Sequence, residues 1–165
     1  MPRRLKRNYA VIIGPALFVV ILDQVSKAVL TGALRLHESV PVIPGVFNLV
    51  HVRNRGMAFG LLNRSHADMA FWLLVGASCM AIGLLLFWFL RLKDGDTRMT
   101  LGLSLILGGA IGNLIDRLRF REVVDFLDVF WGTYHWPAFN VADAAITVGT
   151  FWVAISLIFR STSTA

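Results

Sequence analysis

Four apolar stretches, each long enough to cross a lipid bilayer as a helix, dominate this 165-residue chain and restrict what it can fold into. A helix needs about 20 predominantly apolar residues to span roughly 30 Å of hydrocarbon. The stretches that meet this requirement cover residues 9–30, 70–90, 100–118 and 138–159. Because 56% of the residues are hydrophobic and only 16% are charged, an ordinary soluble domain is excluded. We therefore predict an all-α polytopic membrane protein with four transmembrane helices.

Basic residues near the ends of the spans predict the orientation of the chain. The segment PRRLKR directly precedes the first span, and RLKDGDTR joins the second span to the third. Lys and Arg concentrate on the cytoplasmic side of membrane proteins, so both termini are expected in the cytoplasm and residues 31–67 outside it. The N-terminal cluster also favours contact with membrane lipids, and we expect no nucleic-acid partner. The spans leave no room for a soluble module, which predicts one integral membrane domain over residues 1–165.

The long connection between the first two spans contains VFNLVHVR at residues 46–53. This stretch is rich in β-branched and aromatic residues and is bounded by Pro-Gly and Arg-Gly turn signals. We predict a small extracytoplasmic β-sheet or loop that caps the helix ends. In the third span, glycines at 108, 109 and 112 form a small-residue face that is typical of close helix packing.

Polar and charged side chains converge on one level of the predicted bundle. Because successive spans run in opposite directions, residues far apart in sequence reach the same outer end of the helices. An Asp at the centre of a membrane helix costs about 2.5 to 3.5 kcal/mol, so a group of them requires a reason. The residues in question are Asp23 and Lys27 in the first span, Asn113, Asp116 and Arg117 in the third, Asp125 and Asp128 in the connection VVDFLDVF, and Asn140 and Asp143 at the start of the fourth.

Two readings of this cluster are open from the residues alone. In the first, the charges are ion pairs and helix caps: Asp23 with Lys27, Asp116 with Arg117, and Asn140 or Asp143 at a helix N-terminus. The second concerns Asp125 and Asp143, which have no basic neighbour within four positions except Arg121. Two facing carboxylates can share a proton and act on a water as general base and general acid. That reading predicts an aspartic hydrolase at a membrane surface.

Other chemistries fit the sequence less well. The four histidines lack the spacing of a zinc site, and no glycine-rich phosphate loop is present, so we expect neither a metal nor an organic cofactor. A small transporter or scaffold subunit with buried Asp and Lys pairs is the alternative function. A proton relay would place ionisable groups at several depths, whereas the cytoplasmic halves of the four spans contain none. A presenilin-type protease would carry a GxGD motif, which does not occur.

Five separated motifs resemble those of the bacterial lipoprotein signal peptidases, also called signal peptidase II. They are LDQVSK at 22–27, NRGMAF at 54–59, GGAIGNLIDR at 108–117, VVDF at 123–126 and FNVAD at 139–143. Each motif alone is weak evidence for the family, but five motifs in the same order along nearly the whole chain are a specific signature of it. One departure is Met57, which stands where the family commonly has a small Ala and bears on the fit of substrates or inhibitors.

The resemblance implies a function and a set of site residues. The implied enzyme is a membrane aspartic endopeptidase that removes signal peptides from diacylglyceryl-modified prolipoproteins, cutting on the N-terminal side of the modified cysteine. It would lie in the bacterial inner membrane with its active site near the outer face. The resemblance assigns the catalytic pair to Asp125 and Asp143. It also implies that the following residues bind substrate or brace the site: Asp23, Lys27, Asn54, Gly56, Asn113, Asp116, Arg117 and Asn140.

Overall fold

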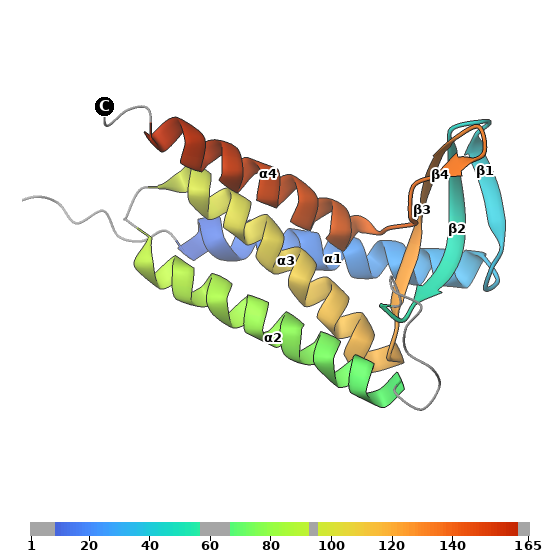
Figure 1. The fold of residues 1–165 in the computed structure, drawn as a ribbon, viewed down its shortest axis with the longest axis horizontal. Coiled ribbons are helices and arrows are strands. Elements are labelled where there is room, and N and C mark those ends of the chain that lie inside the picture. The colour runs from blue at the N-terminus through green and yellow to red at the C-terminus, as the bar shows by residue number, and fades with distance from the viewer. Residues whose placement is uncertain (1–8, 57–66, 93–95, 162–165) are drawn as a thin grey trace, which may run out of the picture.

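The computed structural model describes residues 9–56, 67–92 and 96–161 of the chain, and Met57 lies outside these ranges. Within them, four helices run roughly side by side and a four-stranded sheet lies at one end of the helices (Figure 1). We call this end the sheet end. The elements follow in the order α1 (Tyr9–Ala33), β1 (Ser39–Ile43), β2 (Phe47–Asn54), α2 (Ala67–Arg91), α3 (Thr97–Phe120), β3 (Val123–Trp131), β4 (Tyr134–His135) and α4 (Val141–Ser161).

All four helices are long and apolar enough to cross a membrane, which confirms the predicted fold class. The candidate spans cover Val11–Ala33, Asp68–Arg91, Thr97–Phe120 and Val141–Phe159. Most of the large side chains exposed on the helices are apolar, as expected of helices that face lipid. Each predicted span corresponds to one of these helices, and the fourth helix begins three residues later than the predicted start of its span.

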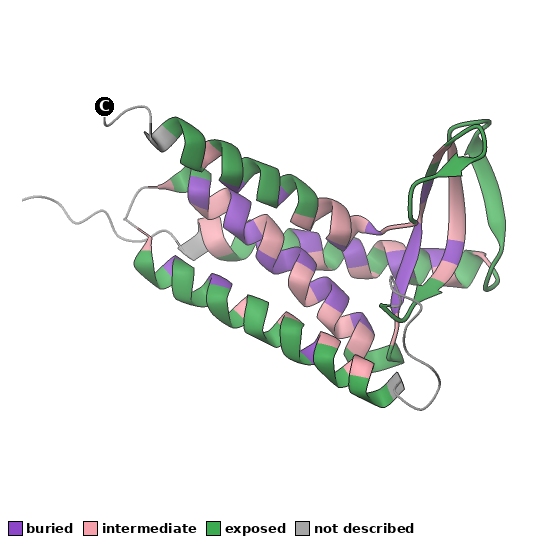
Figure 2. Cartoon of the chain, viewed as in Figure 1, coloured by how far each residue is buried: buried purple, intermediate pink, exposed green. Residues whose placement is uncertain are grey.

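Helix α3 forms the core of the bundle. In the apolar 18-residue stretch of its span 56% of the residues are buried, against 11% in that of α2, and Figure 2 shows more buried bands along α3 than along α2. Its glycines explain how closely the helices approach. A Cβ at Gly108 would lie 2.6 Å from the carbonyl oxygen of Ala16 on α1, and one at Gly109 would lie 2.4 Å from that of Ala142 on α4. The predicted small-residue face is therefore a packing surface for α1 and α4.

The sheet is antiparallel throughout, with the strand order β1-β2-β3-β4. The predicted strand at residues 46–53 is present as β2, but the segment VVDFLDVF is not a simple connection as the sequence suggested. It forms β3, in which Val52 of β2 pairs with Asp125 and Asn54 pairs with Val123. The first four residues of β3 are all buried, so the strand lacks the alternation of apolar and polar residues by which strands are recognised.

Candidate active site

Asp125 lies on β3 and is almost completely buried, with 2% of its surface exposed. Two side-chain amides hold its carboxylate. Asn54, at the end of β2, donates to Oδ2 at 3.0 Å, and Asn140 donates to Oδ1 at 2.8 Å. Because the register of β2 and β3 sets the position of Asn54 beside β3, the sheet itself orients this carboxylate.

Asp143 and Asn140 form the N-terminal cap of α4. The side-chain oxygen of Asn140 accepts the backbone N–H of Asp143 at 2.9 Å, and Oδ2 of Asp143 faces the backbone N–H of Asn140 at 3.4 Å. This reciprocal arrangement is a capping box, and it places a carboxylate at the positive end of the helix dipole. The capping alternative is therefore correct for Asn140 and Asp143. It does not use the whole carboxylate, because Oδ1 of Asp143 points to Asn113, which donates to it at 2.8 Å.

Asn113 on α3 connects the two carboxylates to the buried lysine. Its Oδ1 accepts from Asn140 at 3.2 Å and from Nζ of Lys27 at 3.3 Å, while its Nδ2 is the donor to Asp143. Asn113 and Asn140 are thus hydrogen-bonded to each other, and each holds one carboxylate of the pair. These contacts join α1, α3, β3 and the start of α4 in one polar network.

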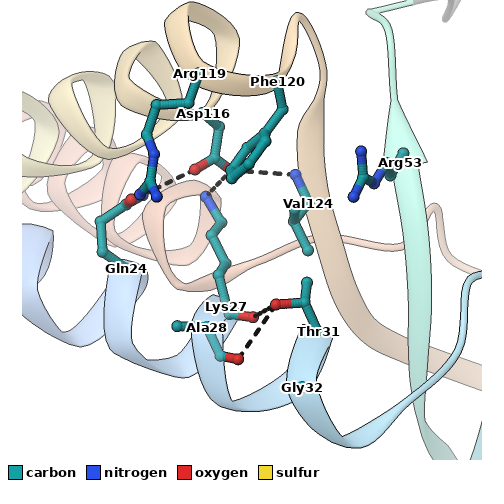
Figure 3. A pocket seen from close by; sticks show the side chains of 10 residues that line it. All are labelled: Gln24, Lys27, Ala28, Thr31, Gly32, Arg53, Asp116, Arg119, Phe120 and Val124. Atoms are coloured by element: carbon teal, nitrogen blue, oxygen red, sulfur yellow. Dashed lines mark hydrogen bonds and ion pairs between the residues drawn. The ribbon is translucent and has the colours of Figure 1, made fainter.

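Lys27 forms a buried ion pair with two carboxylates. Its Nζ lies 2.8 Å from Asp23. It also lies 2.8 Å from Asp116, as Figure 3 shows. The pairing of Asp23 with Lys27 is as predicted, but the pairing of Asp116 with Arg117 is wrong. Adjacent residues of a helix point about 100° apart, so Arg117 projects to another face of α3 while Asp116 faces α1.

The two carboxylates that hold Lys27 also fix backbone groups next to the proposed catalytic residues. Asp116 accepts the N–H of Val124, the residue before Asp125, at 3.1 Å. Asp23 accepts the N–H of Ala142, the residue before Asp143, at 2.9 Å. Each carboxylate therefore holds in place the chain segment that carries one member of the pair.

Gln24 is a residue of this network that the sequence analysis missed. Its amide donates to Asp116 at 2.9 Å, to Asp23 at 3.1 Å and to the carbonyl of Gly112 at 3.2 Å. The available signal was its position beside Asp23 within an otherwise apolar span, since a polar side chain there needs partners.

Arg117 faces α2 and the carboxylate pair. Its Nη1 donates to the hydroxyl of Ser78 on α2 at 3.2 Å, and its charge interacts with those of Asp143, Asp116 and Asp125. A positive side chain thus stands beside the buried Asp125 and the half-buried Asp143, without a direct hydrogen bond to either among the described residues.

Gly56 follows Asn54 in a tight turn. It has a φ of 75°, its N–H donates to Oδ1 of Asn54 at 2.8 Å, and a Cβ at this position would lie 2.3 Å from the side chain of Leu74. Gly56 therefore orients Asn54 toward Asp125 and lets the chain pass close to α2.

One predicted member does not join the cluster. Asp128 lies on β3 but accepts a hydrogen bond from Asn48 at 2.9 Å and contacts His135 at 2.9 Å, both within the sheet. Residues of a strand that are three positions apart point to opposite faces, so Asp125 and Asp128 cannot both face the helices. Arg121 is likewise not a partner of Asp125, because it forms an exposed ion pair with Asp68 at 2.6 Å.

The environment of Asp125 favours its protonated form. Burial and, to a smaller extent, the nearby charge of Asp143 raise the pKa of Asp125 from 3.8 to about 6, against the opposing effects of the hydrogen bonds from Asn54 and Asn140 and of the charge of Lys27. Two carboxylates that influence each other in this way can share a proton. Among the described residues, no group of three or more His, Cys, Asp or Glu side chains is arranged to hold a metal ion. The two neighbouring carboxylates, one of which has a raised pKa, are suited to acid–base chemistry on a water molecule.

Residues 15–159 match the family model described as signal peptidase (SPase) II. The chain is 45% identical over 153 residues to a lipoprotein signal peptidase of Nitratidesulfovibrio vulgaris, and the match covers 93% of this chain and 92% of the relative. It is 44% identical over 154 residues to a lipoprotein signal peptidase of Geobacter sulfurreducens, covering 93% and 95% of the two chains.

Solved structures with the same fold are also similar over nearly the whole chain. One is a bacterial membrane enzyme determined by the in meso method at 2.3 Å resolution, with a TM-score of 0.85, 30% identity and coverage of 99% of this chain and 97% of the other. A second, determined by the same method at 1.9 Å resolution, has a TM-score of 0.82, 32% identity and coverage of 94% and 97%.

Proposed function

The chain belongs to the signal peptidase II family, a multi-pass bacterial membrane protease that removes signal peptides from prolipoproteins, and we propose that it does so as an aspartic endopeptidase with Asp125 and Asp143 as the catalytic pair. The observation that carries this proposal is the joint orientation of the two carboxylates. Asn113 and Asn140 are bonded to each other, and each holds one of the carboxylates.

The proposed reaction uses a water held between the two acids. One carboxylate removes a proton from the water as its oxygen attacks the scissile carbonyl, and the other carboxyl donates its proton to the carbonyl oxygen. The tetrahedral diol then collapses: its carbon–nitrogen bond breaks and the leaving nitrogen takes a proton. The amine and the new carboxyl are released, and one shared proton remains on the pair.

The surroundings of the two residues support different starting roles. Asp125 is buried and its raised pKa lets it carry the shared proton close to neutral pH. Asp143 lies in the first turn of α4, where the helix dipole and Asn113 stabilise negative charge. We assign Asp125 as the initial acid and Asp143 as the initial base.

The remaining polar residues of the cluster fall into two proposed groups. Asn54 and Arg117 border the pair and are suited to hydrogen-bond carbonyl groups of the substrate. The ion pair of Lys27 with Asp23 and Asp116 braces the site through the backbone contacts at Val124 and Ala142. These bracing residues need not touch the substrate.

The depth of the site supports a substrate that is itself anchored in the membrane. The cluster lies at the sheet end of the helices, where the spans end and the interface with water begins. A precursor held by its signal helix and by the acyl chains of a diacylglyceryl cysteine would present its scissile bond at this depth. We propose that cleavage occurs N-terminal to that cysteine, and that the sheet end faces outward with both termini in the cytoplasm.

A cleavage assay with purified protein tests this function. The substrates are a diacylglyceryl-modified prolipoprotein and the same precursor without the lipid, and only the modified form should be cut. Cleavage of both would contradict the proposed substrate class, while cleavage of neither would favour the alternative of a non-enzymatic membrane subunit. Insensitivity to chelators would agree with carboxylate chemistry.

A further inference from the structure

A cavity of about 320 Å³ opens between α1, α3 and the neighbouring ends of β2 and β3, where Arg53 pairs with Val124. Figure 3 shows its lining, in which Lys27 and Asp116 form the floor. Neither Asp125 nor Asp143 lines it. The cavity shares Gln24, Lys27 and Asp116 with the polar network that supports the candidate active site.

The positive charges that a ligand in this cavity can contact are those of Arg53 and Arg119, which lie at its rim. Lys27 is taken up by Asp23 and Asp116, so it offers no free charge to a ligand. Arg53 and Arg119 flank the ring of Phe120, with their guanidinium carbons 5.6 and 5.0 Å from the ring centroid (Figure 3). Both side chains are exposed, so each guanidinium is free to turn toward a group bound beside the ring.

Neither rim arginine is satisfied by a close carboxylate in the described part of the chain. Arg119 has no ion pair there, and Arg53 approaches Glu122 only to 3.8 Å. Glu122 is engaged by Arg55 through a much shorter contact. Two exposed arginines that lie on an aromatic ring beside a cavity, with no close carboxylate partner among the described residues, are suited to bind a phosphate group.

The location of the cavity indicates where the rest of the ligand would lie. Thr31 and Gly32 in its lining belong to the last turns of α1, so the rim is at the level of lipid headgroups. Below it, α1 exposes apolar side chains that face the surrounding hydrocarbon, among them Phe18, Ile21 and Val25. On the helix surface Ile21 and Val25 are within a turn or two of Ala28 and Gly32, so an acyl chain can run from the cavity along this face.

We propose that this cavity binds an anionic phospholipid, whose headgroup phosphate contacts Arg53 and Arg119 while an acyl chain lies along α1. A zwitterionic headgroup would bring its own ammonium group toward the second arginine and bind more weakly. The bound lipid would fasten the outer part of α1 to α3 and to the neighbouring ends of β2 and β3. This site is independent of the catalytic roles proposed above.

Lipid binding to the purified protein in neutral detergent tests the proposal. Dioctanoyl phosphatidylglycerol is compared with dioctanoyl phosphatidylcholine and with inorganic phosphate, using native mass spectrometry for Kd and thermal unfolding for Tm. Phosphatidylglycerol should bind saturably and raise Tm, and phosphatidylcholine and free phosphate should bind at least about tenfold more weakly, since each lacks either the net charge or the acyl chain. Equal binding of both lipids, or equally tight binding of free phosphate, would overturn it.

Matched variants locate the site. The double variant Arg53→Gln/Arg119→Gln should weaken binding of phosphatidylglycerol by roughly tenfold or more, because two charge-assisted contacts are lost. The control is Arg91→Gln, whose guanidinium also lies over a phenylalanine, Phe87, at 5.1 Å but at the opposite end of the bundle. It should change the affinity no more than about twofold if the binding is site-specific. An unchanged Kd in the double variant, or equal losses in both, would refute the site.

A second pair of variants tests the cavity without changing charge. A Cβ at Gly32 would meet nothing within 4 Å, and Gly32 lines the cavity, so the side chain of Gly32→Leu can start without a clash and occupy the mouth of the cavity. It should also weaken binding of phosphatidylglycerol. Gly14→Leu is the control, since Gly14 lies on the same helix and is equally open. Unchanged affinity in Gly32→Leu would overturn the placement of the lipid even if the arginine variant failed to fold.

Discussion

The side-chain amide of Asn140 donates a 2.8 Å hydrogen bond to the carboxylate of Asp125. The opposite end of the same side chain caps α4 by accepting the N–H of Asp143 at 2.9 Å. One residue thereby sets the position of both acids, one through a side-chain contact and one through the helix backbone.

Replacing either acid by its amide should abolish turnover without unfolding the protein. Asp125→Asn and Asp143→Asn each remove a group that accepts and releases the shared proton, so turnover should fall by at least about three orders of magnitude. The double variant should be little worse than either single one, because the pair acts as a unit. Cleavage normalised to folded enzyme measures this. Near-normal turnover in either single variant would contradict the shared-proton mechanism.

The raised pKa of Asp125 predicts how stability depends on pH. Between pH 3.8 and about 6 the folded protein holds a proton on Asp125 that the unfolded chain releases, so the free energy of unfolding falls as pH rises through this window. Above this pH window the deprotonated, buried Asp125 lowers the free energy of unfolding by up to about 3 kcal/mol. Asp125→Asn removes this buried negative charge. The variant should therefore be more stable than the unchanged protein at pH 8, but it should have no such advantage at pH 4. Thermal unfolding across this range checks it, and a constant difference would contradict the shift.

The buried ion pair should matter for folding far more than an exposed one. Lys27→Met leaves Asp23 and Asp116 buried without a counter-charge and should cost about 3 to 5 kcal/mol of stability. Asp23→Asn should reduce the yield of folded protein more than the turnover of each folded molecule.

The matched control is the exposed pair of Asp68 and Arg121. Asp68→Asn should have little effect on yield or Tm, because water screens such pairs. The readouts are folded yield by size-exclusion chromatography and Tm in detergent. Equal losses in Lys27→Met and Asp68→Asn would show that burial does not determine the contribution of these charges.

Close packing of α3 on α4 should make Gly109 intolerant of a methyl group. In Gly109→Ala the new Cβ would meet the carbonyl oxygen of Ala142 at 2.4 Å, so the helices must separate at a cost of about 1 to 3 kcal/mol. Since Ala142 precedes Asp143, turnover should fall as well. Gly76→Ala, on the open surface of α2, should be neutral or slightly stabilising. Tm and cleavage rates of the two variants provide the comparison.

The proposed orientation can be tested by labelling from outside intact cells. After replacement of Cys79 by Ser, a cysteine introduced at Thr133, in the turn between β3 and β4, should react with a membrane-impermeant maleimide. A cysteine appended after Ala165 should react only once the membrane is opened. The reverse pattern would place the site on the cytoplasmic face and contradict the positive-inside prediction.

Much of this protein could be predicted from its sequence because the relevant signals are local. The length and apolarity of a span are properties of consecutive residues. Because successive spans alternate in direction, the sequence alone predicts that Asp23, Asp116 and Asp143 lie at one level of the bundle. The small-residue face of α3 was recognisable for the same reason. The five motifs identified the family, whose model matches residues 15–159.

What only the tertiary structure decided is which of these groups meet. Lys27 pairs with Asp116 across 89 positions of sequence, VVDFLDVF is a strand because β2 is available to pair with it, and Asp128 turns into the sheet while Asp125 faces the helices. Gln24 and Asn140 matter through partners on other helices and strands. The physical reason is that a buried polar group is stabilised by whichever complementary group packing brings within hydrogen-bond distance, and sequence spacing does not determine that choice.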